Sequence, residues 1–323
     1  MRRIGSLAIV LAAFGLGSGA RADDQVTLRL NWILYGFHTP FHLGLDRGYY
    51  KDEGIDLTIG DGQGSGRTVQ VVAAGGDTFG ISDAGSVIAG AAKGAPVRSV
   101  LAVSNSSPYA VGVRADLGAK SAKDLTGMTI AATAGEAGVQ LWPAILAANG
   151  MAPDATKFLM VDGPGKMVAV LEKRTEAVMA GLDNQCLIIP ARGMDLTCLK
   201  YADMGVNTVG LTVHTRNDLI ESNPDLVRRF VRASVKALDA AVADPDASIA
   251  AGMKVKPDAE KDLWRQQLDV GIGLMKTPAT KDLPTGTFAE SDWQDTLDLM
   301  KKYQGLETDQ PVTAFFTNEF LPK

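Results

Sequence analysis

The chain has 323 residues, of which 46% are hydrophobic and 21% charged, and its formal net charge is −5. This composition is typical of a globular protein and excludes a disordered or collagen-like chain, and the length predicts roughly two domains. The acidic balance argues against the basic surface that nucleic-acid binding requires. With three histidines and two cysteines and no zinc-ligand spacing, we expect neither a metal nor another cofactor.

The first segment, residues 1–22, has the pattern of a secretory signal peptide. A basic start precedes an uncharged stretch over residues 4–20, and Ala20-Arg21-Ala22 fits a small-x-small cleavage site. This stretch contains too much glycine and serine for a membrane-spanning helix. We therefore expect export to a bacterial periplasm and a mature chain with 29 basic against 37 acidic residues, since the leader carries three arginines.

Cys186 and Cys198 are the only cysteines, and an exported protein is free to form a disulfide. Sequence does not decide whether their Cα atoms come within bonding range, so the pairing stays open. A catalytic thiol is disfavoured because no histidine lies near either cysteine in the sequence.

Short apolar strands alternate with helices over the N-terminal third of the chain. This alternation predicts an α/β fold with parallel strands, in which ligands bind at the carboxyl ends of the strands. The expected strands are 27–31, 55–59, 79–82 and 97–103, and the expected helices are 41–47, 67–74 and 87–93, with residues 49–54 as a connector.

The same pattern restarts in the middle third, and the C-terminal third is mainly helical. The middle third is therefore interpreted as an insertion: lobe 1 comprises residues 23–107 and 213–323, and lobe 2 comprises residues 108–212. Two crossings, near 105–112 and 207–213, would join the lobes and form a cleft that closes around a ligand. The expected elements are strands at 128–132, 157–161, 177–181 and 208–213, and helices at 139–149, 166–173, 224–244, 258–275 and 292–303.

Six motifs in order resemble the NMT1/THI5-like family. They are Asn31-Trp32 with His38-Thr39-Pro40, the segment from Gly48 to Leu57, GGDTFGISD ending at Asp83, KDLTGMTI from Lys123, NPDLVRRF from Asn223, and TNEFLP from Thr317. The resemblance implies a two-lobed, type II-like periplasmic binding protein. It also implies a monomer that is not an enzyme, whose partners are a small-molecule ligand and the inner-membrane permease of an ABC importer.

The stretch from Trp32 to His38, the Trp293-Gln294 helix and the TNEFLP tail are similar to the branch that binds thiamin-precursor pyrimidines. That branch implies a flat heteroaromatic ligand. One alternative is nitrate, a sulfonate such as taurine, or another small anion. A second is a secreted enzyme or a pyrimidine synthase, although the cysteine-rich run of the eukaryotic synthases is absent here. A third is a sensor that presents a ligand to a receptor.

Several candidate ligand-binding residues lie in the N-terminal strand and turn regions. Trp32 and Tyr35 offer rings for stacking, although either ring can instead pack beneath its loop. His38 offers a donor for a ring nitrogen or a carboxylate, or else is a helix-capping or surface histidine. Gly64 and Ser65 form either a plain turn or an anion-receiving turn at a helix N-terminus, which is not a Walker or Rossmann motif.

Polar candidates follow the later strands. Asp83 can accept a hydrogen bond from a ligand amino group or can cap the helix after it. Asn105 and Tyr109 lie at the first crossing, and Glu136, Asp183 and Asn184 lie in the second lobe. The acidic side chains suit a neutral or amine-bearing ligand better than an anion, and the sequence has no recognisable catalytic triad or glycosidase carboxylate pair.

Overall fold

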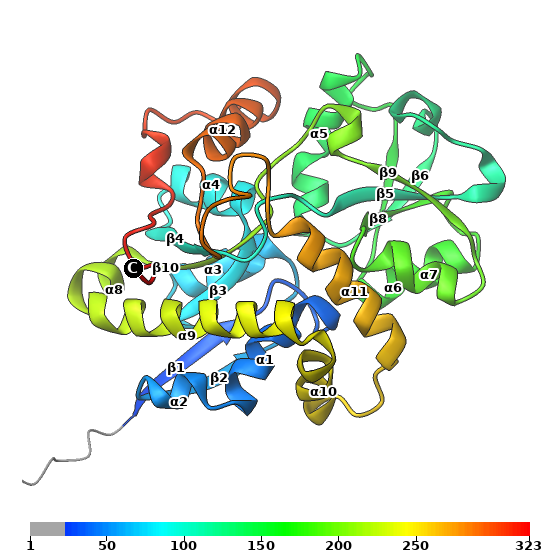
Figure 1. Cartoon of the computed structure of the whole chain (residues 1–323). Helices are drawn as coiled ribbons and strands as arrows, with labels where there is room; N and C mark the ends of the chain where they lie inside the picture. The colour runs from blue at the N-terminus through cyan, green and yellow to red at the C-terminus, as the bar shows by residue number, and fades with distance from the viewer. Residues whose placement is uncertain (1–22) are drawn as a thin grey trace, which may run out of the picture.

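A computed structural model describes residues 23–323 (Figure 1). The expected signal peptide, residues 1–22, lies outside the described residues. Two five-stranded sheets, each with helices against its faces, form two lobes, and the predicted two-lobed α/β fold is confirmed.

The sheet of the first lobe has the strand order β2-β1-β3-β10-β4. Its first three strands run parallel, whereas β10 lies antiparallel between β3 and β4. Alternating apolar side chains such as Val26 and Leu28 place one face of β1 in the core. The strands are β1 (Asp24–Arg29), β2 (Ile55–Gly60), β3 (Phe79–Asp83), β4 (Val97–Ala102) and β10 (Leu211–Arg216).

The sheet of the second lobe repeats this layout with the strand order β7-β6-β8-β5-β9. Here β5, the strand that enters from the first lobe, lies antiparallel between β8 and β9. The strands are β5 (Tyr109–Arg114), β6 (Thr129–Ala132), β7 (Lys157–Met160), β8 (Ala177–Gly181) and β9 (Leu196–Lys200).

The four strands predicted in the N-terminal third do run in one direction, but each complete sheet also contains antiparallel pairs that this pattern did not predict. Each chain crossing delivers a strand that enters the sheet from the opposite direction, so β5 and β10 pair antiparallel with both of their neighbours. The apolar, β-branched pattern of these two strands predicts burial but carries no information about direction.

The helices lie close to their predicted positions, with some additions. The expected connector at residues 49–54 contains the short helix α2, and Asp244 with Pro245 ends one helix and also begins the next. In the first part of the chain the helices are α1 (Thr39–Asp46), α2 (Tyr49–Asp52), α3 (Ser65–Ala73), α4 (Ala84–Ala92), α5 (Ala137–Ala148), α6 (Gly163–Leu171) and α7 (Gln185–Ala191). In the last third they are α8 (Asn217–Ser222), α9 (Pro224–Ala243), α10 (Pro245–Val255), α11 (Lys261–Leu274) and α12 (Glu290–Gln304), and five 3₁₀ turns complete the set: η1 (Gly36–His38), η2 (Ala115–Leu117), η3 (Ala122–Leu125), η4 (Ala202–Met204) and η5 (Val312–Ala314).

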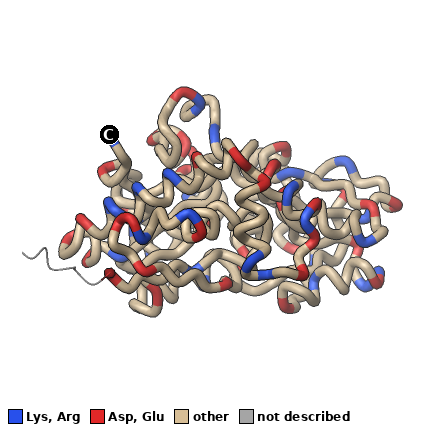
Figure 2. Tube along the Cα trace, turned by 60° about the horizontal axis from the view of Figure 1, so that its bottom comes forward, with Lys and Arg blue, Asp and Glu red and all other residues tan. Residues whose placement is uncertain are grey.

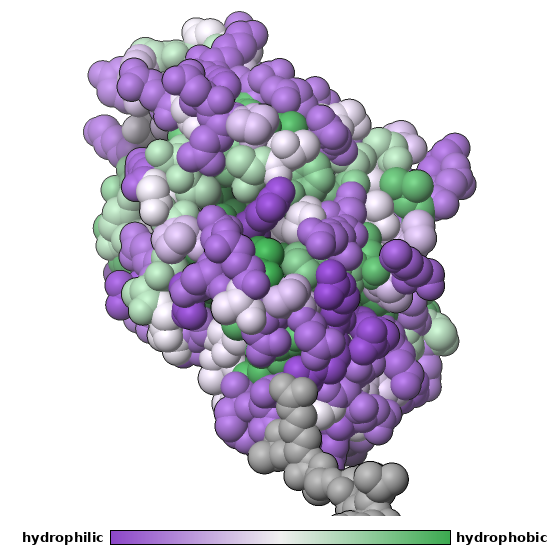
Figure 3. All heavy atoms as spheres, turned by 90° about the vertical axis from the view of Figure 1, so that its left-hand side faces the viewer, coloured by the Kyte–Doolittle hydropathy of each residue, from purple (hydrophilic) through white to green (hydrophobic). Residues whose placement is uncertain are grey.

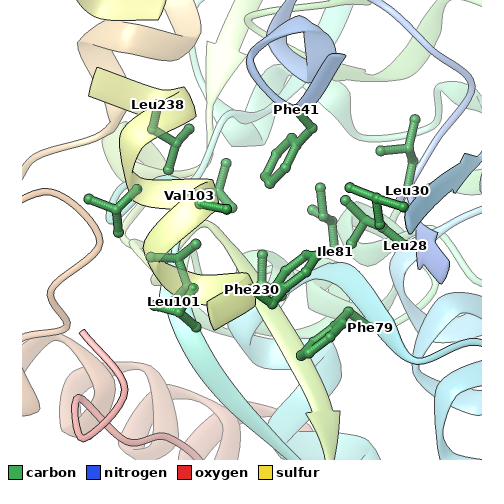
Figure 4. Packing of buried hydrophobic residues seen from close by; sticks show 14 of the residues in the cluster. Leu28, Leu30, Phe41, Phe79, Ile81, Leu101, Val103, Phe230 and Leu238 are labelled. Atoms are coloured by element: carbon green, nitrogen blue, oxygen red, sulfur yellow. The ribbon is translucent and has the colours of Figure 1, made fainter. Parts of the chain in front are cut away.

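The largest apolar cluster lies between the first sheet and α9 (Figure 4). Phe79 of β3 stacks on Phe230 of α9 with ring centroids 3.9 Å apart. The helix begins at Pro224 because the side chain of Asn223 accepts a hydrogen bond from the Leu226 amide, as the sequence predicts. This packing gives the first lobe a fixed frame for the strand ends that form the site.

Charged residues of both signs are interspersed along the chain (Figure 2), and the face in Figure 3 is largely hydrophilic with scattered apolar side chains. No helix within residues 23–323 combines the length and the apolar character needed to cross a membrane.

Candidate functional site

A small pocket, with a cavity volume of about 50 Å³, lies where the carboxyl ends of strands from both sheets approach one another. This volume is well below the roughly 300–1,000 Å³ of typical small-molecule sites, so residues of the two lobes lie close together around it. Of the predicted residues, those that line it are Trp32, Tyr35, Gly64, Ser65, Tyr109, Glu136, Asp183 and Asn184. The fold therefore brings together side chains that are up to about half the chain apart in sequence.

Tyr35 and Asp183 meet across the two lobes. The Tyr35 hydroxyl donates a hydrogen bond of 2.5 Å to Oδ2 of Asp183, and both side chains are buried. Burial raises the pKa of Asp183 to about 6, and the hydrogen bond from Tyr35 partly offsets that effect. Burial, and then the charge of Asp183, raise the pKa of Tyr35 well above its ordinary value, so the phenol remains a donor.

Glu136 is the second carboxylate of the pocket, and Lys166 neutralises it. Oε1 of Glu136 accepts a hydrogen bond from Nζ of Lys166, and Oε2 accepts one from the Thr133 amide at 3.1 Å. Lys166 is fully buried, donates also to the Met179 carbonyl at 2.9 Å, and places its ammonium 4.9 Å from the centre of the Trp32 ring. Asp183 is therefore the pocket carboxylate without a cationic partner in the described chain.

Trp32 contacts the second lobe directly. A Cβ atom at Gly163 would lie 2.7 Å from the Trp32 ring, so glycine permits this close approach. Together with the Lys166 ammonium, this contact covers part of the indole with residues of α6. Trp32 thus lines the pocket and also contacts the opposite lobe.

The glycine turn before α3 brings the backbones of the two lobes together. Gly64 has a φ of 114°, which favours glycine, and a Cβ there would lie 2.9 Å from the Gly135 carbonyl oxygen. The Gly66 amide donates to that same carbonyl at 3.4 Å. The Gly66 amide of this turn therefore forms a hydrogen bond between the lobes, and the alternative that the turn receives an anion stays a prediction.

Three predicted residues, Asp83, Asn105 and His38, do not line the pocket. Asp83 caps α4, because its Oδ1 accepts from the Ser86 amide at 2.9 Å, and burial raises its pKa. Asn105 donates from Nδ2 to the carbonyls of Met275 and Thr287, each at 3.1 Å, so it joins the first crossing to the C-terminal part of the chain. Asp83 therefore has the helix-cap role that the sequence offered as its alternative, and Asn105 bonds to the C-terminal part of the chain.

His38 lies one layer behind the pocket. Its Nε2 is 2.8 Å from Oδ1 of Asn31. Its ring packs edge-on against the ring of Tyr35, with the two ring centroids 4.4 Å apart. Burial lowers the pKa of His38 to about 3, so the ring is neutral at physiological pH. It therefore orients two pocket residues rather than lining the pocket itself.

Several residues that line the pocket were not among the predicted site residues, and neither was Lys166, which lies behind the pocket. The position of Asn31 at a strand end and of Gln185 beside Asn184 offered a signal. Lys166 offered none, since it is one lysine in an ordinary helical segment. The further lining residues are Asn31, Pro108, Ala137, Ala180, Gly181, Gln185 and Leu211.

Cys186 of α7 and Cys198 of β9 form a disulfide, with Cα atoms 6.3 Å apart. The structure therefore answers the question that the sequence left open, because the two cysteines are paired. Within residues 23–323, no group of three or more His, Cys, Asp or Glu side chains is arranged to hold a metal ion.

Residues 36–248, more than half of the sequence, match the NMT1/THI5 like family. The chain belongs to this family. The relatives include the riboflavin-binding protein RibY of Chloroflexus aurantiacus, which is 27% identical over 93% of this chain and 86% of its own. The formylaminopyrimidine-binding protein of Halalkalibacterium halodurans is 24% identical over 97% of each chain.

Enzymes are also among the relatives of this family member. The 4-amino-5-hydroxymethyl-2-methylpyrimidine phosphate synthase THI5 of Saccharomyces cerevisiae is 25% identical over 93% of this chain and 88% of its own. Among solved structures, the alkanesulfonate-binding protein SsuA of Xanthomonas axonopodis pv. citri superposes with a TM-score of 0.71. It is 13% identical over 92% of this chain and 99% of its own, which shows a shared fold.

Proposed function

We propose that this protein is a periplasmic solute-binding protein that captures a small heteroaromatic ligand between its lobes and delivers it to an ABC transporter permease. The observation that carries the proposal is the pocket between the two sheets, whose lining combines aromatic rings with two carboxylates and includes no lysine or arginine. Residues 23–107 with 213–323 and residues 108–212 would move as the two lobes.

The chemistry of the pocket favours a planar ligand with hydrogen-bond donors. The rings of Trp32, Tyr35 and Tyr109 offer apolar surface, and stacking of an aromatic ligand contributes about 0.5–1.5 kcal/mol beyond area burial. Asp183 can accept from an amino group or from a protonated ring nitrogen, since its charge has no cationic partner in the described chain. An aminopyrimidine carries both features.

The names of two relatives support this ligand class, because formylaminopyrimidine and riboflavin are both nitrogen heteroaromatic compounds. A small anion fits the pocket less well. Nitrate or a sulfonate would lie against Asp183, and Lys166 already pairs with Glu136. We therefore rank the heteroaromatic ligand above an anion.

Binding decides between these ligands. Isothermal titration calorimetry with 4-amino-5-hydroxymethyl-2-methylpyrimidine, riboflavin, taurine and nitrate should give binding for a heteroaromatic compound and none for the anions. Ligand should also raise the thermal midpoint, since binding at a hundredfold excess over Kd stabilises the folded state by about 2.7 kcal/mol. Trp32→Ala should weaken binding, whereas Trp293→Phe, a buried residue of α12 outside the pocket lining, serves as the control. Binding of the anions alone would contradict the proposed ligand class.

We further infer that the ligand leaves the protein unaltered. The family contains synthases as well as binding proteins, so this inference needs its own test. Mass spectrometry of the ligand after long incubation with the protein should return the starting compound quantitatively. Conversion to a new species would support the enzyme alternative, and native mass spectrometry of the same sample would test the expected monomer.

A further inference from the structure

The disulfide between Cys186 and Cys198 lies directly beside the pocket. Cys186 follows Gln185, the first residue of α7, and Gln185 lines the pocket together with Asp183 and Asn184. Cys198 is the central residue of β9, the strand at the edge of the second sheet. One covalent bond thus joins the segment that carries three pocket residues to the outermost strand of that sheet.

Helix α7 has little stability of its own. It has seven residues and contains Pro190, which removes a backbone hydrogen bond, and helices this short are marginal in isolation. The residue before it, Asn184, makes no side-chain capping hydrogen bond. Other constraints are needed to keep the start of this helix in place.

Non-covalent contacts also hold this segment, including the hydrogen bond from Tyr35 to Asp183. Oε1 of Gln185 accepts from the Gly181 amide at 3.0 Å, and the Leu182 amide donates to the Pro108 carbonyl at 2.8 Å. Ile189 is the fully buried apolar residue of the helix, and it packs into the small cluster beneath β8. The disulfide adds a covalent constraint one residue from Gln185.

We propose that the Cys186–Cys198 disulfide is a positioning element of the pocket: it fixes residues 183–185, and its reduction lowers the affinity for ligand while both sheets stay folded. The loss of affinity rests on the proposed function, whereas the loosening of the segment does not. Both cysteines are half-buried, so a small reductant can reach the bond. A dithiol such as dithiothreitol transfers two electrons and two protons to the S–S bond, yields two thiols and becomes a cyclic disulfide.

Hydrogen exchange tests the structural part. Mass spectrometry should compare the oxidised protein, the reduced and alkylated protein, and the variant C186A/C198A. Exchange over residues 182–192 should accelerate at least tenfold in both altered forms, while exchange over β6 and β8 stays unchanged. Unchanged exchange over residues 182–192 after reduction would overturn the proposal, whatever the ligand is.

Calorimetry with 4-amino-5-hydroxymethyl-2-methylpyrimidine tests the functional part. Reduction or C186A/C198A should raise Kd at least tenfold, and reoxidation of the wild-type protein should restore it. Thr156→Val is the matched control, because it removes the 2.8 Å hydrogen bond from Trp142 in the same lobe without touching a pocket residue. It should lower stability and leave Kd unchanged.

The two readouts separate the possible failures. Faster exchange with an unchanged Kd, or an equal rise of Kd in Thr156→Val, would overturn the positioning role. If the oxidised protein binds neither the pyrimidine nor riboflavin, the proposed ligand class fails, and hydrogen exchange still decides whether the disulfide fixes residues 183–185.

Discussion

Tyr35 of the first lobe donates a 2.5 Å hydrogen bond to the carboxylate of Asp183 in the second lobe, and both groups are buried where they meet. A hydrogen bond to a charged acceptor contributes more to stability than a neutral one. Because the two residues belong to different lobes, this bond stabilises the arrangement in which the pocket is enclosed.

Tyr35→Phe removes this donor and leaves the ring in place. We expect the free energy of unfolding at pH 7.5 to fall by about 1.5–3 kcal/mol, the range for hydrogen bonds to charged groups. The pKa of Asp183 should rise above about 6, because the Tyr35 hydrogen bond lowers it in the wild-type protein. Urea denaturation and NMR titration of the carboxyl carbon measure these changes. Tyr49→Phe, at a half-buried ring beside Lys236, is the control, and an equal loss in both variants would refute this role of the bond.

Asp183→Asn should make the protein more stable at pH 7.5 and weaken ligand binding. The pKa of Asp183 is about 6 in the folded state and about 4 in the unfolded state, so the folded protein binds more protons between these values. The stabilising contribution of the protonated acid is complete below about pH 4 and lost as the pH rises through about 6. Asparagine cannot ionise, so the gain of the variant over wild type should grow across this window to at most about 3 kcal/mol.

Urea denaturation of both proteins at pH 4.5, 5.5, 6.5 and 7.5 gives this difference directly. Asp116→Asn is the control, because that carboxyl is exposed and its pKa is lowered by Arg114 rather than raised. A variant–wild-type difference that stays flat with pH would show that the charged form of Asp183 is not destabilising.

Much of the site could be predicted from the sequence, because the end of a strand is marked by a change from apolar to polar or glycine-rich residues. Trp32, Ser65 and Asp183 each follow an apolar stretch or a turn, and the general rule for α/β sheets places such residues at one edge. Asp83 and Asn105 satisfied the same rule and yet lie outside the pocket lining, because their side chains bond to Ser86 and to backbone carbonyls. Position at a strand end does not determine where a side chain points.

Strand direction and the pairing of side chains far apart in sequence could not be predicted from the sequence, for a different reason. The antiparallel entry of β10 between β3 and β4 depends on the path of the whole second lobe. Lys166 and Glu136 are 30 positions apart, and their pairing depends on how α6 and the start of α5 pack over the sheet. Local periodicity reports burial, whereas these features follow from packing between distant segments.

All three histidines should remain neutral in the folded protein down to pH 5. Burial lowers the pKa to about 3 for His38 and His214 and to about 4 for His42. The unfolded chain takes up these protons near pH 6.5, so the contribution of the neutral rings to stability is complete above pH 6.5 and is lost as the pH falls toward 3–4. Imidazole ¹H–¹⁵N spectra should show no titration between pH 8 and 5. A midpoint near 6.5 for any of the three would show that its ring is not buried as described.

Lys166→Met should destabilise the protein by about 3 kcal/mol, the lower end for removal of one partner from a buried ion pair, because Glu136 keeps some exposure. The loss arises because the carboxylate of Glu136 is left without its cation, and the ammonium beside the Trp32 ring is lost as well.

E136Q/K166M should recover part of the stability, since no unpaired charge then remains. Urea denaturation measures both variants, and the tryptophan emission maximum should shift in each, since Trp32 is the tryptophan beside the Lys166 ammonium. Lys254→Met, which breaks an exposed pair with Asp46, should cost little in comparison. If Lys166→Met is no more costly than Lys254→Met, or if the double variant is less stable than the single one, the buried pair does not have the role assigned to it.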